Sequence, residues 1–144
     1  MPRSIRSKSL ISVEINITAV EPFAQHVIEN PCILNTVFTE RETAYCMNKR
    51  RIYEHLSARF AAKKATFKAL GTGLSYRIQW TEVEVINDAN GKPHICLYGE
   101  VAALAQKWGL IDLNVSLAHT VGVAVAYIVV VWNNVKMYRL NNPG

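Results

Sequence analysis

The chain has 144 residues, of which half are apolar and 19% are charged. This composition excludes a disordered protein, and the length indicates one domain with a sizeable core. The formal net charge of +5 suggests an anionic partner without identifying it. The three cysteines are scattered and form no C-x-x-C pair, so neither a disulfide framework nor a zinc site is expected.

The apolar stretches are too short for a membrane protein. The longest, residues 123–132, cannot cross a bilayer, and Glu14 interrupts the first apolar run before it reaches signal-peptide length. We therefore expect a cytoplasmic protein that binds neither membranes nor nucleic acid.

The chain is expected to divide into a basic arm at residues 1–9, a single domain at 10–132 and a polar tail at 133–144. Residues 10–17 alternate between apolar and polar side chains. This alternation predicts a half-buried strand with Glu14 and Asn16 on the same face.

The next segment is predicted to be helical. Pro22 suits the first turn of a short helix that ends at residue 29, and the spacing of Thr39 and Glu42 is typical of a capping box. A long helix follows at residues 51–70, and Gly71 fits its C-terminal stop.

The C-terminal half returns to strands. A strand at 78–87, a turn and a return strand at 93–98 form a hairpin, and a helix at 99–108 follows. Two strands are expected at 113–117 and 122–132, and the second is apolar on both faces, as in a central strand or a subunit contact. The fold class is therefore α+β, with a long helix packed on a largely antiparallel sheet.

Half of the 16 Lys and Arg residues lie between residues 41 and 68, where Arg59, Lys63 and Lys68 belong to the long helix. A solvated helix face explains such a cluster, and so does phosphate binding by clustered donors.

Three motifs carry a family resemblance. ARFAAKKATFKALGTG at 58–73, DANGKP at 88–93 and NVSLAHT at 114–120 resemble the signature blocks of holo-acyl-carrier-protein synthases. These are small, trimeric 4′-phosphopantetheinyl transferases, which move 4′-phosphopantetheine from coenzyme A to a serine of an acyl carrier protein. The resemblance implies that fold, a homotrimer with sites between subunits, and Mg²⁺ bridging the enzyme and the coenzyme A pyrophosphate.

The resemblance also implies site residues. Those expected to line a pocket for coenzyme A or its pantetheine arm are Arg59, Lys68, Gly71, Lys92, Pro93, Ser116 and Thr120. His119 belongs to the last block, and its imidazole is a candidate acid or base, or else a hydrogen-bonded structural group.

Both metal ligands of the family are replaced. Asn16 stands where the family has a strand aspartate, and Lys64 stands where it has a helix glutamate. Because an amide is a weak Mg²⁺ ligand and an ammonium is none, no metal is expected at this position. We expect instead an ion pair between Glu14 and Lys64, which with His119 make up the candidate catalytic residues. Another departure is that residues 18–40 contain no Lys or Arg, so the surface that docks the carrier protein is expected to be altered.

Three functions are consistent with these residues. The departures favour a repurposed, metal-independent enzyme that acts on a pantetheine thioester, linked to a carrier protein or to coenzyme A, in polyketide or fatty-acid biosynthesis. The alternatives are an active holo-acyl-carrier-protein synthase and a non-catalytic binding or scaffold protein.

Overall fold

The computed structural model describes residues 9–72 and 77–133. Residues 1–8 of the arm predicted at 1–9, Gly73, and the tail beyond Asn133 lie outside this part. The elements in chain order are β1 (Ser9–Ala19), α2 (Val20–Glu29), α3 (Ile33–Thr36), α4 (Glu40–Met47), α5 (Ile52–Leu70), the 3₁₀ turn η1 (Trp80–Glu82), β2 (Val83–Asn87), β3 (Pro93–Leu97), α6 (Gly99–Lys107), β4 (Leu110–His119) and β5 (Val123–Asn133).

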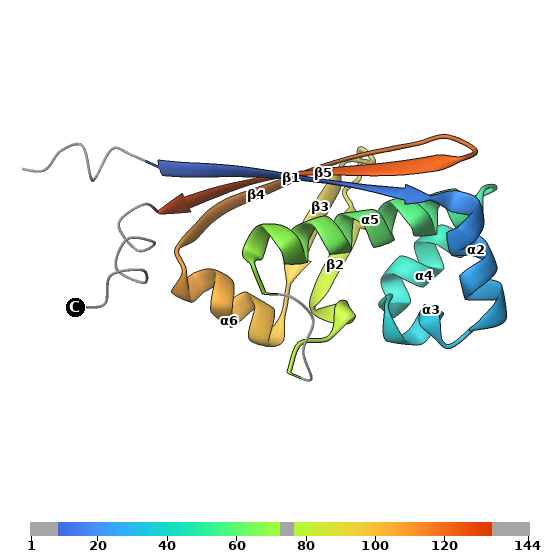
Figure 1. The fold of residues 1–144 in the computed structure, drawn as a ribbon, viewed down its shortest axis with the longest axis horizontal. Helices are drawn as coiled ribbons and strands as arrows, with labels where there is room; N and C mark the ends of the chain where they lie inside the picture. The colour runs from blue at the N-terminus through green and yellow to red at the C-terminus, as the bar shows by residue number, and fades with distance from the viewer. Residues whose placement is uncertain (1–8, 73–76, 134–144) are drawn as a thin grey trace, which may run out of the picture.

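The strands form two antiparallel sheets rather than one. The larger has the order β1-β5-β4, and the smaller is the β2-β3 hairpin. The doubly apolar strand at the C-terminal end is central, as predicted. In Figure 1 the larger sheet forms an outer layer, α5 runs along its inner side, α2–α4 lie toward the start of α5, and α6 lies toward its end. The α+β class with a long helix on antiparallel strands is confirmed.

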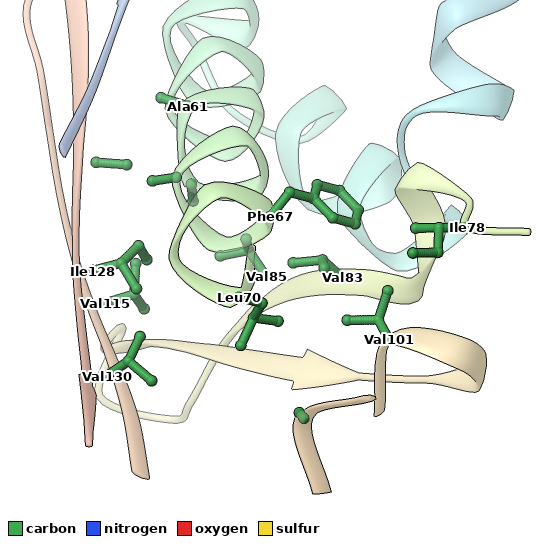
Figure 2. Packing of buried hydrophobic residues seen from close by; sticks show 14 of the residues in the cluster. Ala61, Phe67, Leu70, Ile78, Val83, Val85, Val101, Val115, Ile128 and Val130 are labelled. Carbon is green, nitrogen blue, oxygen red and sulfur yellow. The ribbon is translucent and has the colours of Figure 1, made fainter. Parts of the chain in front are cut away.

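The core lies on both sides of α5. Small side chains at Ala61 and Ala65 let the helix approach the sheet closely, and both are buried. Figure 2 shows Ile128 and Val130 directed from the sheet toward α5, while Val83 reaches toward it from β2. Among the described residues, no helix is long and apolar enough to cross a membrane.

Gly71 ends α5 as predicted. Its φ of +68° lies in the left-handed region that favours glycine, and its N–H donates to the carbonyl of Lys68 over 3.1 Å. The helix therefore stops because the chain must reverse at a residue without a Cβ.

The faces of β1 are reversed relative to an ordinary half-buried strand. Its polar side chains face α5, whereas Ile11, Ile15 and Ile17 are 64%, 51% and 66% exposed on the outer face. No described element covers this face of the sheet (Figure 1). A row of exposed isoleucines is costly in water, so the outer face is a candidate interface.

The strand predicted at 78–87 begins only at Val83. The Glu82 carboxylate accepts from the N–H of Gln79 over 2.7 Å and from the N–H of Val101 over 3.1 Å. These bonds hold residues 80–82 in a 3₁₀ turn and dock α6 against it. The local alternation could not reveal this, because Val101 is distant in sequence.

The predicted capping box at Thr39 and Glu42 is present, and Glu42 does more than cap α4. Its Oε1 accepts from the Thr39 N–H over 2.9 Å and lies 2.7 Å from the Lys63 Nζ, while its Oε2 accepts from the Val85 N–H over 2.8 Å. One buried carboxylate thus connects α4, α5 and β2.

Lys63 is fully buried, so it does not belong to a phosphate-binding surface. Besides Glu42, its ammonium donates to the carbonyls of Trp80 and Val83. Burial lowers the pKa of Lys63, and the Glu42 carboxylate opposes this effect. The basic cluster of the sequence therefore divides into two buried residues, Arg59 and Lys63, and exposed ones such as Lys64 and Lys68.

Replacing Lys63 with methionine removes one partner of the buried pair and leaves the Glu42 charge uncompensated. We expect the K63M variant to lose about 3–5 kcal/mol of unfolding free energy in urea denaturation. The exposed neighbour Lys64 provides the control, because K64M should change this free energy by less than about 0.5 kcal/mol. Equal stabilities of the two variants would contradict the role assigned to the pair.

Candidate functional site

A pocket of about 180 Å³ lies where α5, the β2–β3 hairpin and the end of β4 meet. α4 also contributes to it through Tyr45, so four segments line the pocket, and several of its side chains are polar or aromatic. It is lined by Tyr45, His55, Ala58, Arg59, Asn87, Gly91, Pro93, Leu117 and His119.

Arg59 forms one wall of the pocket and is only 2% exposed. Its guanidinium donates to the side-chain oxygen of Asn87 and lies 4.1 Å from the ring centroid of Tyr45. Its Nε has no hydrogen-bond partner within the described part of the chain. A buried guanidinium with an unused donor is a ready binding group for an anion.

Asn87 connects Arg59 to the hairpin turn. It ends β2, and its Nδ2 donates to the carbonyl of Gly91 over 2.9 Å. The turn itself is closed by the Asp88 carboxylate, which accepts from the backbone N–H groups of Asn90 and Lys92. The DANGKP motif thus holds Pro93 against the pocket while it orients the partner of Arg59.

His119 closes the pocket at the end of β4. Its Nδ1 lies 2.8 Å from Oε1 of Glu54 on α5, and Oε2 of that carboxylate accepts from Arg51 over 3.1 Å. The hydrogen bond from His119, followed by the contact with Arg51, lowers the pKa of Glu54 against the opposing effect of burial. Because an ionised carboxylate can only accept, Nδ1 carries the proton of this hydrogen bond, and Nε2 is the ring nitrogen that remains for a ligand.

His55 is a neighbour that the sequence did not single out. Its ring stands edge-on to that of His119, with centroids 4.7 Å apart. Burial, and then the positive charge of nearby His119, Arg59 and Lys49, lowers the pKa of His55. Neutral His55 therefore fills the pocket wall without adding a further charge.

The remaining predicted ligands do not all reach this pocket. Pro93 lines it, and Lys92 precedes it as an exposed residue of the turn. Gly71 stands at the far end of α5, where an added Cβ would lie 4.0 Å from Trp108. Ser116 is exposed on β4, and the Thr120 hydroxyl accepts from the Val123 N–H over 3.2 Å in the following turn.

A second group of predicted residues lies along the line where β1 meets α5, which we call the seam: Glu14, Asn16, Lys64 and Lys68. The expected ion pair between Glu14 and Lys64 is wrong, because Glu14 Oε2 instead lies 3.7 Å from Lys68 Nζ. Lys64 is exposed, and its Nζ lies 5.3 Å from the ring centroid of Phe60. The lining of the pocket includes none of the seam residues.

Glu54, Asn87 and Tyr45 are site residues that sequence reasoning missed. Glu54 and its partner His119 are 65 positions apart, and no local pattern marks such a pair. Asn87 had a weaker signal, because it directly precedes the turn motif that carried the resemblance.

The seam does not suit the Mg²⁺ ion that the family resemblance implies. The Asn16 Oδ1 already accepts from the Thr18 hydroxyl over 3.0 Å, and Lys64 offers an ammonium group. Mg²⁺ is usually held by one or two carboxylates with waters and substrate phosphates, and of the four seam residues only Glu14 has a carboxylate, which lies 3.7 Å from the Lys68 ammonium. The donor set therefore does not fit a divalent cation.

Known proteins resemble this chain over most of its length. Residues 15–125 match the 4′-phosphopantetheinyl transferase superfamily. The holo-[acyl-carrier-protein] synthase of Geotalea daltonii is 40% identical over 116 residues, which are 80% of this chain and 93% of that protein. The synthase of Protochlamydia amoebophila is 45% identical over 96 residues, which are 67% of this chain and 76% of that protein.

A solved structure agrees with these relatives. The ACPS–CoA complex of Chronobacterium ammoniagenes has a TM-score of 0.75 and 28% identity, and the match covers 85% of this chain and 98% of that one. The resemblance drawn from the three motifs is confirmed, and the chain belongs to the holo-acyl-carrier-protein synthase family of the 4′-phosphopantetheinyl transferase superfamily.

Proposed function

We propose that this protein transfers the 4′-phosphopantetheine group of coenzyme A to a serine of an acyl carrier protein. Relatives named holo-[acyl-carrier-protein] synthase support this alternative better than a repurposed thioester enzyme or a scaffold. Coenzyme A is the proposed donor, since a related structure at 28% identity is a complex with it.

The observation that carries the proposal is the guanidinium of Arg59 in the lining of the pocket. Coenzyme A presents phosphate groups, and a guanidinium binds phosphate through parallel N–H donors. The apolar surroundings at Leu117 and Pro93 strengthen such an interaction because they exclude water.

The reaction needs one proton acceptor. The carrier serine Oγ forms a bond to the pantetheine-side phosphorus, the pyrophosphate P–O bond breaks, and 3′,5′-ADP leaves. We assign the serine proton to Nε2 of His119, because Glu54 holds the other ring nitrogen in its protonated form.

Carrier docking is assigned to the start of α5. A hollow of about 320 Å³ beside the Glu54 end of the site is lined by Arg50, Arg51, Tyr53 and Val20. Acyl carrier proteins are acidic, and α2 has no Lys or Arg to meet them. Arg51 is also exposed but lies 3.1 Å from Glu54, so Arg50 is the exposed cation of this hollow without an ion pair to another described residue.

The exposed outer face of the sheet supports a homotrimer. On β1 and β5 this face carries apolar side chains: Ile11, Val13, Ile15, Ile17, Val123, Val125, Tyr127, Val129 and Val131. β4 adds a polar border of Asp112, Asn114 and Ser116. Contact with two further copies would cover this face, and each copy would bring its seam beside another copy's pocket. A site between subunits explains why the two groups of residues stand apart within one chain.

Replacing His119 with asparagine keeps a donor for Glu54 but removes the proton acceptor. We expect the H119N rate of holo-carrier formation, followed by intact mass of the carrier, to fall about 10²- to 10⁴-fold. Binding of coenzyme A should change much less. The same substitution at exposed His26 on α2 is the control, and equal rates for the two variants would contradict the assignment.

Reversing the charge of Arg50 tests carrier docking. We expect R50E to raise the KM for an acidic carrier protein about tenfold without changing the affinity for coenzyme A. The effect should shrink at high ionic strength, because the residue is exposed. If R50E and the distant exposed variant K107E gave the same KM, the docking surface would lie elsewhere.

Placing a charge at Ile15 tests the trimer. Light scattering should give a trimer for the wild type and a monomer for I15E, which should also lose transferase activity. Ile28 on α2 is 56% exposed, comparable with Ile15 at 51%, so I28E should remain trimeric. A monomeric wild type, or a trimeric I15E variant, would overturn this interface.

A further inference from the structure

The seam has the charge of an anion site rather than a cation site. Glu14 is its one carboxylate, while Lys64 and Lys68 project from α5 at positions four apart, which share a helix face. A divalent cation placed here would meet more positive than negative charge. The same excess of positive charge attracts a phosphate group.

Both lysines are free to bind a ligand. Lys68 is 73% exposed, and its 3.7 Å separation from Glu14 is longer than a hydrogen bond, so this pair is weak and easily exchanged. Lys64 has no ion pair within 9–72 and 77–133, and its only contact of note is with the ring of Phe60.

Glu14 and Asn16 limit what else the seam can hold. The Asn16 amide is already engaged by the Thr18 hydroxyl, and Glu14 is 27% exposed and directed toward Lys68. Glu14 therefore balances one lysine, and the charge of Lys64 remains for the ligand.

We propose that Lys64 and Lys68 bind the phosphates of coenzyme A directly, so that binding and transfer proceed without a divalent cation. This inference rests on the proposed function for its ligand. A lysine is a workable point-charge binder of phosphate, although it supplies one charge where Mg²⁺ supplies two. The lysine ammonium groups thus neutralise phosphate charge at the seam, as the metal ion does in the family.

The first test is calorimetric and needs no turnover. Titration of the full-length protein with coenzyme A should give the same Kd in EDTA and in Mg²⁺, and Mn²⁺ alone should show no bound fraction by electron paramagnetic resonance. K64E should weaken binding about tenfold in EDTA, the size of one charge-assisted hydrogen bond. The matched charge reversal K107E on α6 should leave the affinity for coenzyme A unchanged. Metal-dependent binding, or equal Kd values for K64E and K107E, would overturn the inference.

Restoring the family's ligands provides the converse test. The N16D/K64E double variant should bind Mn²⁺ and should bind coenzyme A only when a divalent cation is present. If the double variant stayed indifferent to metal, the seam would not be the position of the family's ion, and the inference would fail.

Turnover separates this inference from the proposed function. Holo-carrier formation in EDTA supports both. Formation only with Mg²⁺ overturns metal independence and leaves the transferase function in place. No product in either condition overturns the transferase function, while the calorimetric comparison of wild type, K64E and K107E still decides whether the lysines bind phosphate.

Discussion

The buried ion pair between Glu42 and Lys63 determines where the pocket residues lie. The Glu42 carboxylate fixes the N–H of Val85, and the Lys63 ammonium fixes the carbonyl of Val83, so β2 is attached to α5 by charge as well as by packing. Asn87 ends this strand, and Arg59 lies one helical turn before Lys63. Their contact across the pocket is a consequence of the same attachment.

Such a pair is a costly way to join two elements, because two charges must leave water. The pair makes the position of β2 relative to α5 specific. Apolar packing of α5 against β2 would tolerate a small slide, whereas the Glu42 oxygens accept from fixed donors on three elements. A slide of one strand residue would remove the Val85 N–H from Glu42 and the Val83 carbonyl from Lys63, so the position of β2 along α5 is strongly determined.

The reversed faces of β1 link assembly to chemistry. An ordinary edge strand would turn its isoleucines inward, but then Glu14 and Asn16 would point away from α5 and no seam would exist. With the polar face inward, the apolar face of β1 is left exposed. The exposed face and the seam therefore both follow from the orientation of this one strand.

Features that depend only on neighbouring residues, such as helix caps and turns, could be predicted from the sequence. The cap at Thr39, the stop at Gly71 and the turn before Pro93 each follow from a few adjacent residues, and each is present. The partners of Glu54 and Glu14 could not be predicted in this way. Those contacts depend on how β4 and β1 approach α5, which the pattern of a single strand does not specify.

The exposure of Lys64 explains how the seam could change its chemistry without changing the fold. Arg59 is buried with Asn87 and Tyr45, so its loss would disturb packing. At exposed Lys64, by contrast, a change of charge costs the fold only a few tenths of a kcal/mol through repulsion by Lys68. Glu14 offsets part of that repulsion. Buried Arg59 and exposed Lys64 therefore face different structural constraints, and of the two only Lys64 can change its charge at little cost to the fold.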